Sequence, residues 1–68
     1  MAIRIPAEVY EGLETVRRSG LTNMLDRPQV ARLAEEFGFH ETAEWIRTHK
    51  DEYARGIFQG FEPVEDEE

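Results

Sequence analysis

The sequence contains no cysteine, and only one of its eight basic residues, Lys50, is a lysine. Without cysteine the chain has no disulfide, no thiolate nucleophile and no cysteine-based zinc site. Its uninterrupted apolar runs are only a few residues long, so the sequence predicts neither a signal-peptide core nor a transmembrane helix. We therefore expect a cytoplasmic protein that has no membrane partner.

The chain is short and acidic, with 68 residues and a formal net charge of -7. Its length allows a single small core, and its hydrophobic fraction of 40% is enough for a globular domain. An excess of carboxylates promotes solubility and repels polyanions, so we expect no nucleic-acid partner. The same charge suits a basic surface on a protein partner.

Apolar residues at helical spacing predict a mainly α, compact domain of three to four helices within residues 1–61. Val9, Leu13 and Val16 form one such stripe. We expect helices at 7–18, at 26–37, from His40 to about Thr48, and over a fourth short segment that ends at Gly60. A single long helix would also align the apolar residues of the last two segments, but Thr48 followed by Asp51 resembles a helix start and favours a break.

The two ends of the chain differ from the helical part. Ile3-Arg4-Ile5-Pro6 predicts a short N-terminal β-strand, with an ordered arm as the alternative. Residues 62–68 predict an acidic mobile tail. A core of this size gives little net stability, so we also expect a homodimer, with the Ile3/Ile5 strand edge as a place for it.

The sequence offers little for catalysis or metal binding, and we expect a non-enzymatic protein without cofactor or metal. His40, Glu41 and Glu44 are similar in spacing to the helix motif of zinc proteases, but the second histidine of that motif is Glu44 here. Two ligands without a third are typical of an exposed helix turn. No histidine and acid are placed to activate the hydroxyl groups.

A protein-binding module is the function that this pattern favours. The residues that we expect to contact a partner are Arg4, Asn23, Arg27, Trp45 and Phe61. We choose them because they are exposed, aromatic or part of the connection between the first two predicted helices.

An alternative function comes from the first twenty residues, which resemble the opening of ribbon-helix-helix repressors. The resemblance implies a dimeric DNA-binding regulator in which Ala2 and Arg4 face DNA while Ile3 and Ile5 face the dimer core. Only Arg4 could read bases, and the acidic chain attracts few phosphates.

Nearly the whole chain except its acidic tail resembles a family of short uncharacterised proteins encoded by phages, prophages and some archaeal genomes. The resemblance implies a small accessory protein of a mobile genome, and it carries over no catalytic residue. The segments that carry it are Ile3-Arg4-Ile5-Pro6, Gly20-Leu21-Thr22-Asn23-Met24, Asp26-Arg27-Pro28, Thr42-Ala43-Glu44-Trp45-Ile46 and Tyr53-Ala54-Arg55-Gly56-Ile57-Phe58-Gln59-Gly60-Phe61.

Overall fold

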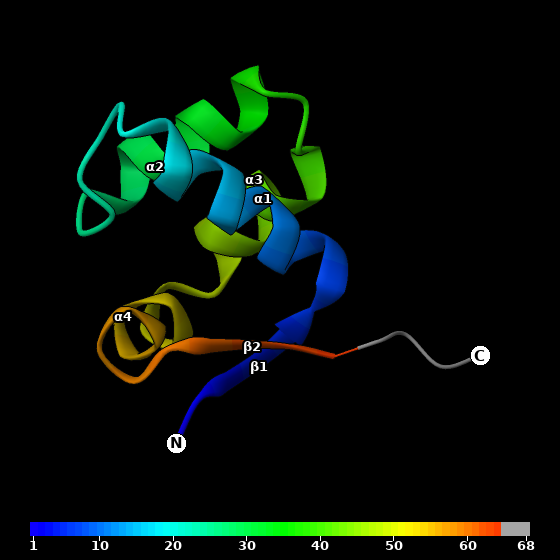
Figure 1. Ribbon diagram of the computed structural model, residues 1–68, viewed down its shortest axis with the longest axis vertical. Coiled ribbons are helices and arrows are strands. Elements are labelled where there is room, and N and C mark those ends of the chain that lie inside the picture. The colour runs from blue at the N-terminus through cyan, green and yellow to red at the C-terminus, as the bar shows by residue number, and fades with distance from the viewer. Residues whose placement is uncertain (65–68) are drawn as a thin grey trace.

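A computed structural model describes residues 1–64 of the chain. Along the chain, one short strand is followed by four helices and then by a second short strand. The mainly α fold with a short N-terminal strand is thus confirmed (Figure 1). In chain order the elements are β1 (Ile3–Pro6), α1 (Ala7–Ser19), α2 (Arg27–Glu36), α3 (His40–Thr48), α4 (Lys50–Gln59) and β2 (Phe61–Val64).

Two glycines follow the first two helices, close to the helix ends predicted at residues 18 and 37. Gly20 adopts a left-handed conformation with φ of 68° and ends α1. Gly38, with φ of 92°, follows α2, and the Phe39 N–H donates to the Ala34 carbonyl at 2.8 Å. This pattern is a Schellman turn, which glycine makes without steric cost.

The predicted break before the fourth helix is confirmed, but its start lies one residue later than expected. His49 occupies the cap position of α4. The Thr48 hydroxyl instead donates back to the Glu44 carbonyl at 2.9 Å. A threonine that binds the preceding turn belongs to the end of α3, not to the start of α4.

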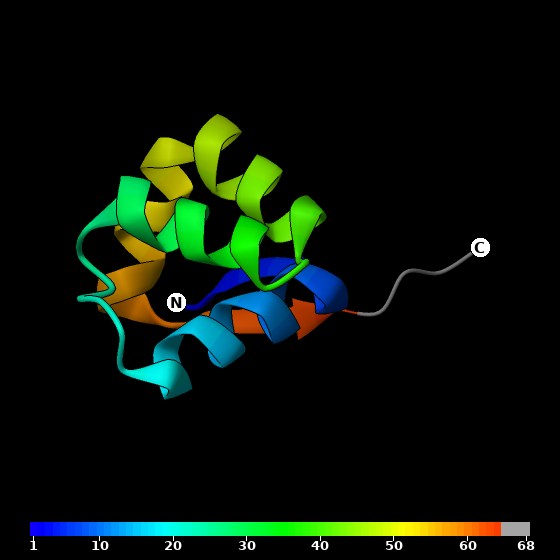
Figure 2. The same cartoon turned by 90° about the horizontal axis from the view of Figure 1, so that it is seen from above.

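The two strands pair in parallel, although all four helices separate them in the chain (Figures 1 and 2). Ile3 lies opposite Phe61, and the Ile3 N–H donates to the Gly60 carbonyl at 2.9 Å. The sequence prediction of a mobile tail from residue 62 therefore differs from the structure at 62–64, which belong to β2. The missed signal is pairing with a distant segment, which local composition does not reveal. The rest of the predicted tail, 65–68, lies outside the described residues.

The core lies where the strands and the inner faces of the helices meet. Its buried members come from every helix and from β1: Ile5, Val9, Leu13, Val16, Val30, Ala31, Ala34, Ala43, Ile46 and Tyr53. Two large apolar side chains lie outside this core, since Leu25 is 63% and Phe58 is 82% exposed. Both lie on the same side of the molecule as the candidate site described below.

Helices α1 and α3 approach each other closely at Gly12 and Thr42, both of which are buried. A Cβ atom on Gly12 would overlap the Thr42 side chain. The Thr42 hydroxyl donates toward the Glu8 and Val9 carbonyls at 3.3 and 3.4 Å, which satisfies this buried polar group. Only glycine therefore fits at position 12, because the Thr42 side chain fills the space that a Cβ atom would need.

Candidate functional site

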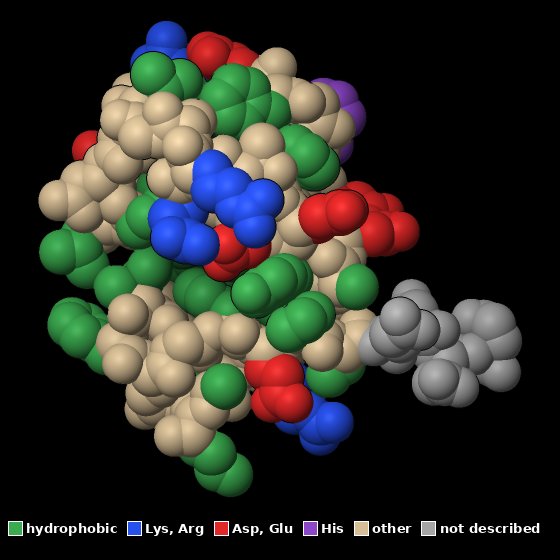
Figure 3. All heavy atoms as spheres, in the orientation of Figure 1, with side chains coloured by type: hydrophobic (Ala, Val, Ile, Leu, Met, Phe, Trp, Pro, Cys, Tyr) green, Lys and Arg blue, Asp and Glu red, His purple; other side chains and the backbone are tan. Residues whose placement is uncertain are grey.

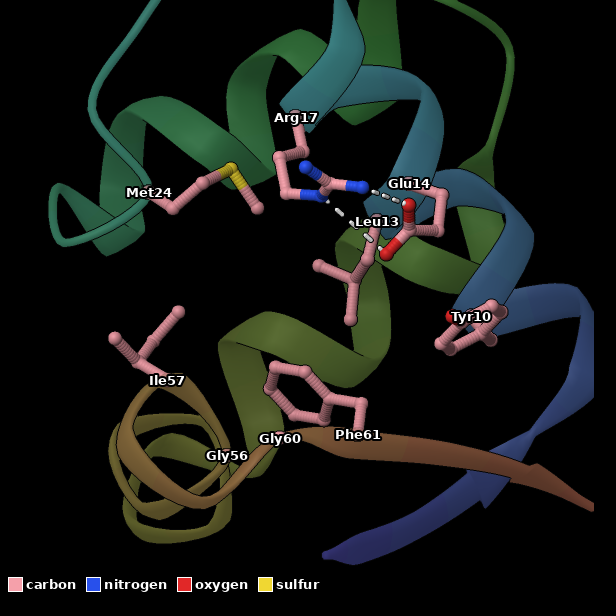
Figure 4. A pocket seen from close by; sticks show the side chains of 9 residues that line it. All are labelled: Tyr10, Leu13, Glu14, Arg17, Met24, Gly56, Ile57, Gly60 and Phe61. Carbon is pink, nitrogen blue, oxygen red and sulfur yellow. Dashed lines mark hydrogen bonds and ion pairs between the residues drawn. The ribbon is translucent and has the colours of Figure 1, made fainter.

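An open hollow of about 390 Å³ lies between α1 and the α4–β2 segment (Figure 4). Figure 3 shows hydrophobic side chains gathered in this part of the surface and over the α1–α2 connection. The lining residues come from three places in the chain: Tyr10, Leu13, Glu14 and Arg17 of α1, Met24 of the connection, and Gly56, Ile57, Gly60 and Phe61. We call this hollow the α1–α4 groove.

The Phe61 ring forms the floor of the α1–α4 groove, and Gly56 makes room for it. A Cβ atom on Gly56 would overlap the far edge of this ring. Behind the floor, the Trp45 ring meets Phe61 edge to face at 6.1 Å, and the Tyr53 ring lies 5.9 Å from it. Trp45, Tyr53 and Phe61 thus form one aromatic cluster next to the groove.

The connection between α1 and α2 forms one wall of the groove, and two hydrogen bonds fix it. The Tyr53 hydroxyl donates to the Met24 carbonyl at 2.5 Å. The Asn23 Oδ1 accepts from the Leu25 N–H at 2.8 Å, which closes a turn stabilised by the asparagine side chain. Tyr53 is 2% exposed, and burial raises its pKa to about 12. The hydroxyl therefore stays protonated and keeps its donor role at neutral pH.

The upper rim of the α1–α4 groove carries an ion pair between Glu14 and Arg17, with atoms 2.5 Å apart (Figure 4). Arg17 lowers the pKa of Glu14, so at neutral pH this carboxylate is charged and paired with Arg17. The other polar side chain in the lining is Tyr10. Such a lining suits apolar contact with a partner better than acid-base chemistry.

A second hollow of about 250 Å³ adjoins the first on the far side of Ile57, whose side chain lines both. We call it the α4 hollow. Its remaining lining residues are Leu25, Arg27, Lys50, Tyr53, Ala54 and Phe58. The exposed Leu25 and Phe58 thus continue the apolar surface of the α1–α4 groove, and together the two hollows form one apolar track.

A separate acidic face lies at the N-terminal turns of α1 and α3. Glu8 and Glu41 come together there, and the Glu41 carboxyl raises the pKa of Glu8 by hydrogen bonding and charge repulsion. His40 lies next to them, and its Nδ1 is 2.7 Å from a carboxylate oxygen of Glu35. Within residues 1–64, no group of three or more histidines and acids is arranged to hold a metal ion.

The structure brings two of the five sequence-predicted contact residues to the apolar track. Phe61 forms its floor, and Arg27 lines the α4 hollow. Asn23 uses its side chain to form the loop turn. Trp45 lies behind Phe61, half-buried, and stacks on His49 with ring centres 4.8 Å apart. Arg4 lies apart from the track, on the exposed side of β1 opposite Glu62.

Sequence reasoning missed Ile57, Phe58 and Leu25 as members of the site. The helical spacing of Lys50, Ala54 and Phe58 was a usable signal, because these residues share one face of α4. Which face turns outward depends on how α4 lies against β1 and α3, and no local pattern gives that orientation.

A family model described as "Domain of unknown function (DUF5049)" matches residues 6–61 of the chain. No curated protein and no solved structure is similar enough to count as a match. In the described part of the chain, none of the helices combines the length and the apolar character that crossing a membrane requires.

Proposed function

The chain belongs to the DUF5049 family of domains of unknown function, and we propose that it is a small non-enzymatic protein-binding module whose contact surface is the apolar track. The observation that carries this proposal is the open α1–α4 groove and its continuation past Ile57 to exposed Leu25 and Phe58. Contiguous exposed apolar surface of this kind is typical of protein contact sites.

The polar groups of the track also support a binding role. The carboxylate in its lining, Glu14, is held by Arg17, and the hydroxyl of Tyr53 is used to fix the α1–α2 connection. Neither group is available to activate a nucleophile. The resemblance to phage- and archaea-encoded proteins supports the further proposal that the module is an accessory protein of a mobile genome that acts in the cytoplasm.

Affinity capture from a lysate of the source organism tests the proposal. The immobilised chain is compared with Ile57→Glu, which places a charge in the middle of the track. Phe37→Glu is the matched control, because Phe37 is 39% exposed and lies at the end of α2, outside the track. We expect a protein that the wild-type chain and Phe37→Glu retain and that Ile57→Glu loses.

Equal capture by the wild-type chain and a folded Ile57→Glu variant would contradict the proposed contact surface. The ribbon-helix-helix alternative makes a different prediction, namely binding to duplex DNA that Arg4→Ala abolishes. Against this alternative, Ile5 is fully buried in the core of its own chain, and β1 already pairs with β2. The strand therefore does not present its apolar side chains as a ribbon does to its mate.

A further inference from the structure

We infer that the segment recognised by the apolar track is an amphipathic partner helix whose apolar residues are flanked by carboxylates. This inference rests on the proposed function, and it names the chemical class of the partner. The bulk charge of -7 suggests the opposite, a basic partner. The charges that line the track decide between the two.

The lining of the two hollows is locally positive. It contains three cations, Arg17, Arg27 and Lys50, and one carboxylate, Glu14. Glu14 is neutralised by Arg17, whereas Arg27 and Lys50 form no ion pair with any of residues 1–64. Asp26 precedes Arg27 in the chain but does not line the hollow. Two cations at the edge of the α4 hollow are therefore available to a partner.

The acidic face that accounts for part of the net charge lies elsewhere. The N-terminal turns of α1 and α3, which carry Glu8 and Glu41, lie on the other side of the molecule from α4 (Figure 1). At physiological ionic strength, exposed charges separated by more than about 8 Å are largely screened. The charges nearest to a partner in the α4 hollow are therefore Arg27 and Lys50, which line it, and Asp26, whose charge also acts on Tyr53.

The shape of the track suits a helix that lies across it. Ile57 stands between the two hollows, so side chains on one stripe of a partner helix can enter on either side of it. A helix of about 16 residues is about 24 Å long and spans a face of this molecule, whose extents are 32 × 24 × 21 Å. Carboxylates beside the apolar stripe would then meet Arg27 and Lys50.

Three synthetic helical peptides of about 16 residues test the inference. They share one stripe of leucine and phenylalanine and differ only in the flanking residues, which are all glutamate, all glutamine or all lysine. Affinity is measured by fluorescence anisotropy at low and high ionic strength. Methyl NMR shifts of Leu13, Met24 and Ile57 report whether a peptide occupies the track.

We expect the glutamate peptide to bind most tightly and to lose affinity as salt is added. The double variant Arg27→Glu/Lys50→Glu should weaken it by about fivefold or more and should favour the lysine peptide. Arg32→Glu/Arg47→Glu is the matched control, because it changes the net charge equally at two exposed arginines outside the track. The control should change the affinity by less than about twofold, and circular dichroism should show that both variants are folded.

Two further outcomes separate the inference from the proposed function. If the glutamine or lysine peptide binds the track at least as tightly as the glutamate peptide, the acidic partner is overturned while the contact surface stands. If no peptide shifts the methyl signals of the track, both ideas fail. Sedimentation that shows self-association of the wild-type chain, lost in Ile57→Glu, would assign the track to a second copy and would also overturn the acidic partner.

Discussion

Helix α1 makes two very different contacts on its two sides. Toward α3, Gly12 and Thr42 are buried and leave no room for an added methyl group. Toward α4, the same helix borders an open hollow of about 390 Å³. The difference arises because Thr42 reaches the α1 backbone directly, whereas the Phe61 ring of β2 takes the space beside Gly56 of α4. The same helix therefore has one closely packed side and one open side.

The largest expected effect is on the closed side. Gly12→Ala should lower the free energy of unfolding by about 3 kcal/mol, because the new methyl group overlaps a buried side chain that cannot move away. Alanine gains about 1 kcal/mol of helix propensity over glycine, so the steric cost must exceed that gain. Urea unfolding measures the change. Adding Thr42→Ala should recover part of the loss, and a Gly12→Ala variant more stable than the wild type would contradict this account.

The next largest effect concerns the Tyr53 hydroxyl, which fixes the α1–α2 connection on the open side, and it appears in the pH dependence of stability. The pKa of Tyr53 is raised to about 12 in the folded chain, and an unfolded tyrosine titrates near 10. Between these values the unfolded state binds fewer protons than the folded state, so stability falls as pH rises. The loss should reach about 2 to 3 kcal/mol across this window.

The matched variant for that experiment is Tyr53→Phe. It removes the titrating hydroxyl, so this part of the alkaline slope should disappear in denaturant unfolding followed from pH 9 to 12. At neutral pH it should cost about 1 kcal/mol, because the Met24 carbonyl loses its donor. An unchanged slope in Tyr53→Phe would show that other groups cause the alkaline loss.

Gly56→Ala provides the direct counterpart of Gly12→Ala on the open side. The added methyl group meets the far edge of the Phe61 ring, and this ring is half-buried and can swing aside. The gain in helix propensity offsets much of the cost, so stability should change by less than about 1 kcal/mol. Because Trp45 is the single tryptophan and contacts Phe61, its fluorescence should shift. A loss as large as that of Gly12→Ala would remove the contrast between the two sides.

The smallest effect on stability is expected at the rim of the track. Phe58 is 82% exposed, so Phe58→Ser should change the free energy of unfolding by less than about 0.5 kcal/mol. The same variant should weaken the glutamate peptide, since a large apolar contact is lost. Thermal melts and anisotropy measure the two effects. A clear loss of stability with unchanged peptide binding would show that Phe58 supports the fold and not the contact surface.

Much of the fold could be predicted from the sequence, because its signals are local. Apolar spacing and the stop signals at Gly20 and Gly38 locate the helices. The second strand could not be predicted, since Phe61–Val64 acquires its conformation from pairing with Ile3–Pro6, far away in the chain.

The candidate site was harder to predict than the helices. Arg27 and Phe61 reach the apolar track, but Trp45 turned out to support it from behind, because an aromatic residue gives no local sign of which side it packs on. Net charge was equally uninformative about the track. A sum over the chain does not show that carboxylates gather at the N-terminal turns of α1 and α3 while the cations Arg27 and Lys50 line the α4 hollow.

The parallel pairing of β1 with β2 also has a consequence for how the protein is made. The first strand leaves the ribosome before any helix, and its partner leaves after all four of them. Until Phe61 has emerged, Ile3–Pro6 is an unpaired strand edge, which is the kind of surface that associates with other chains. The emergence of Phe61–Val64 therefore lets this edge pair and also brings Phe61 into the lining of the groove.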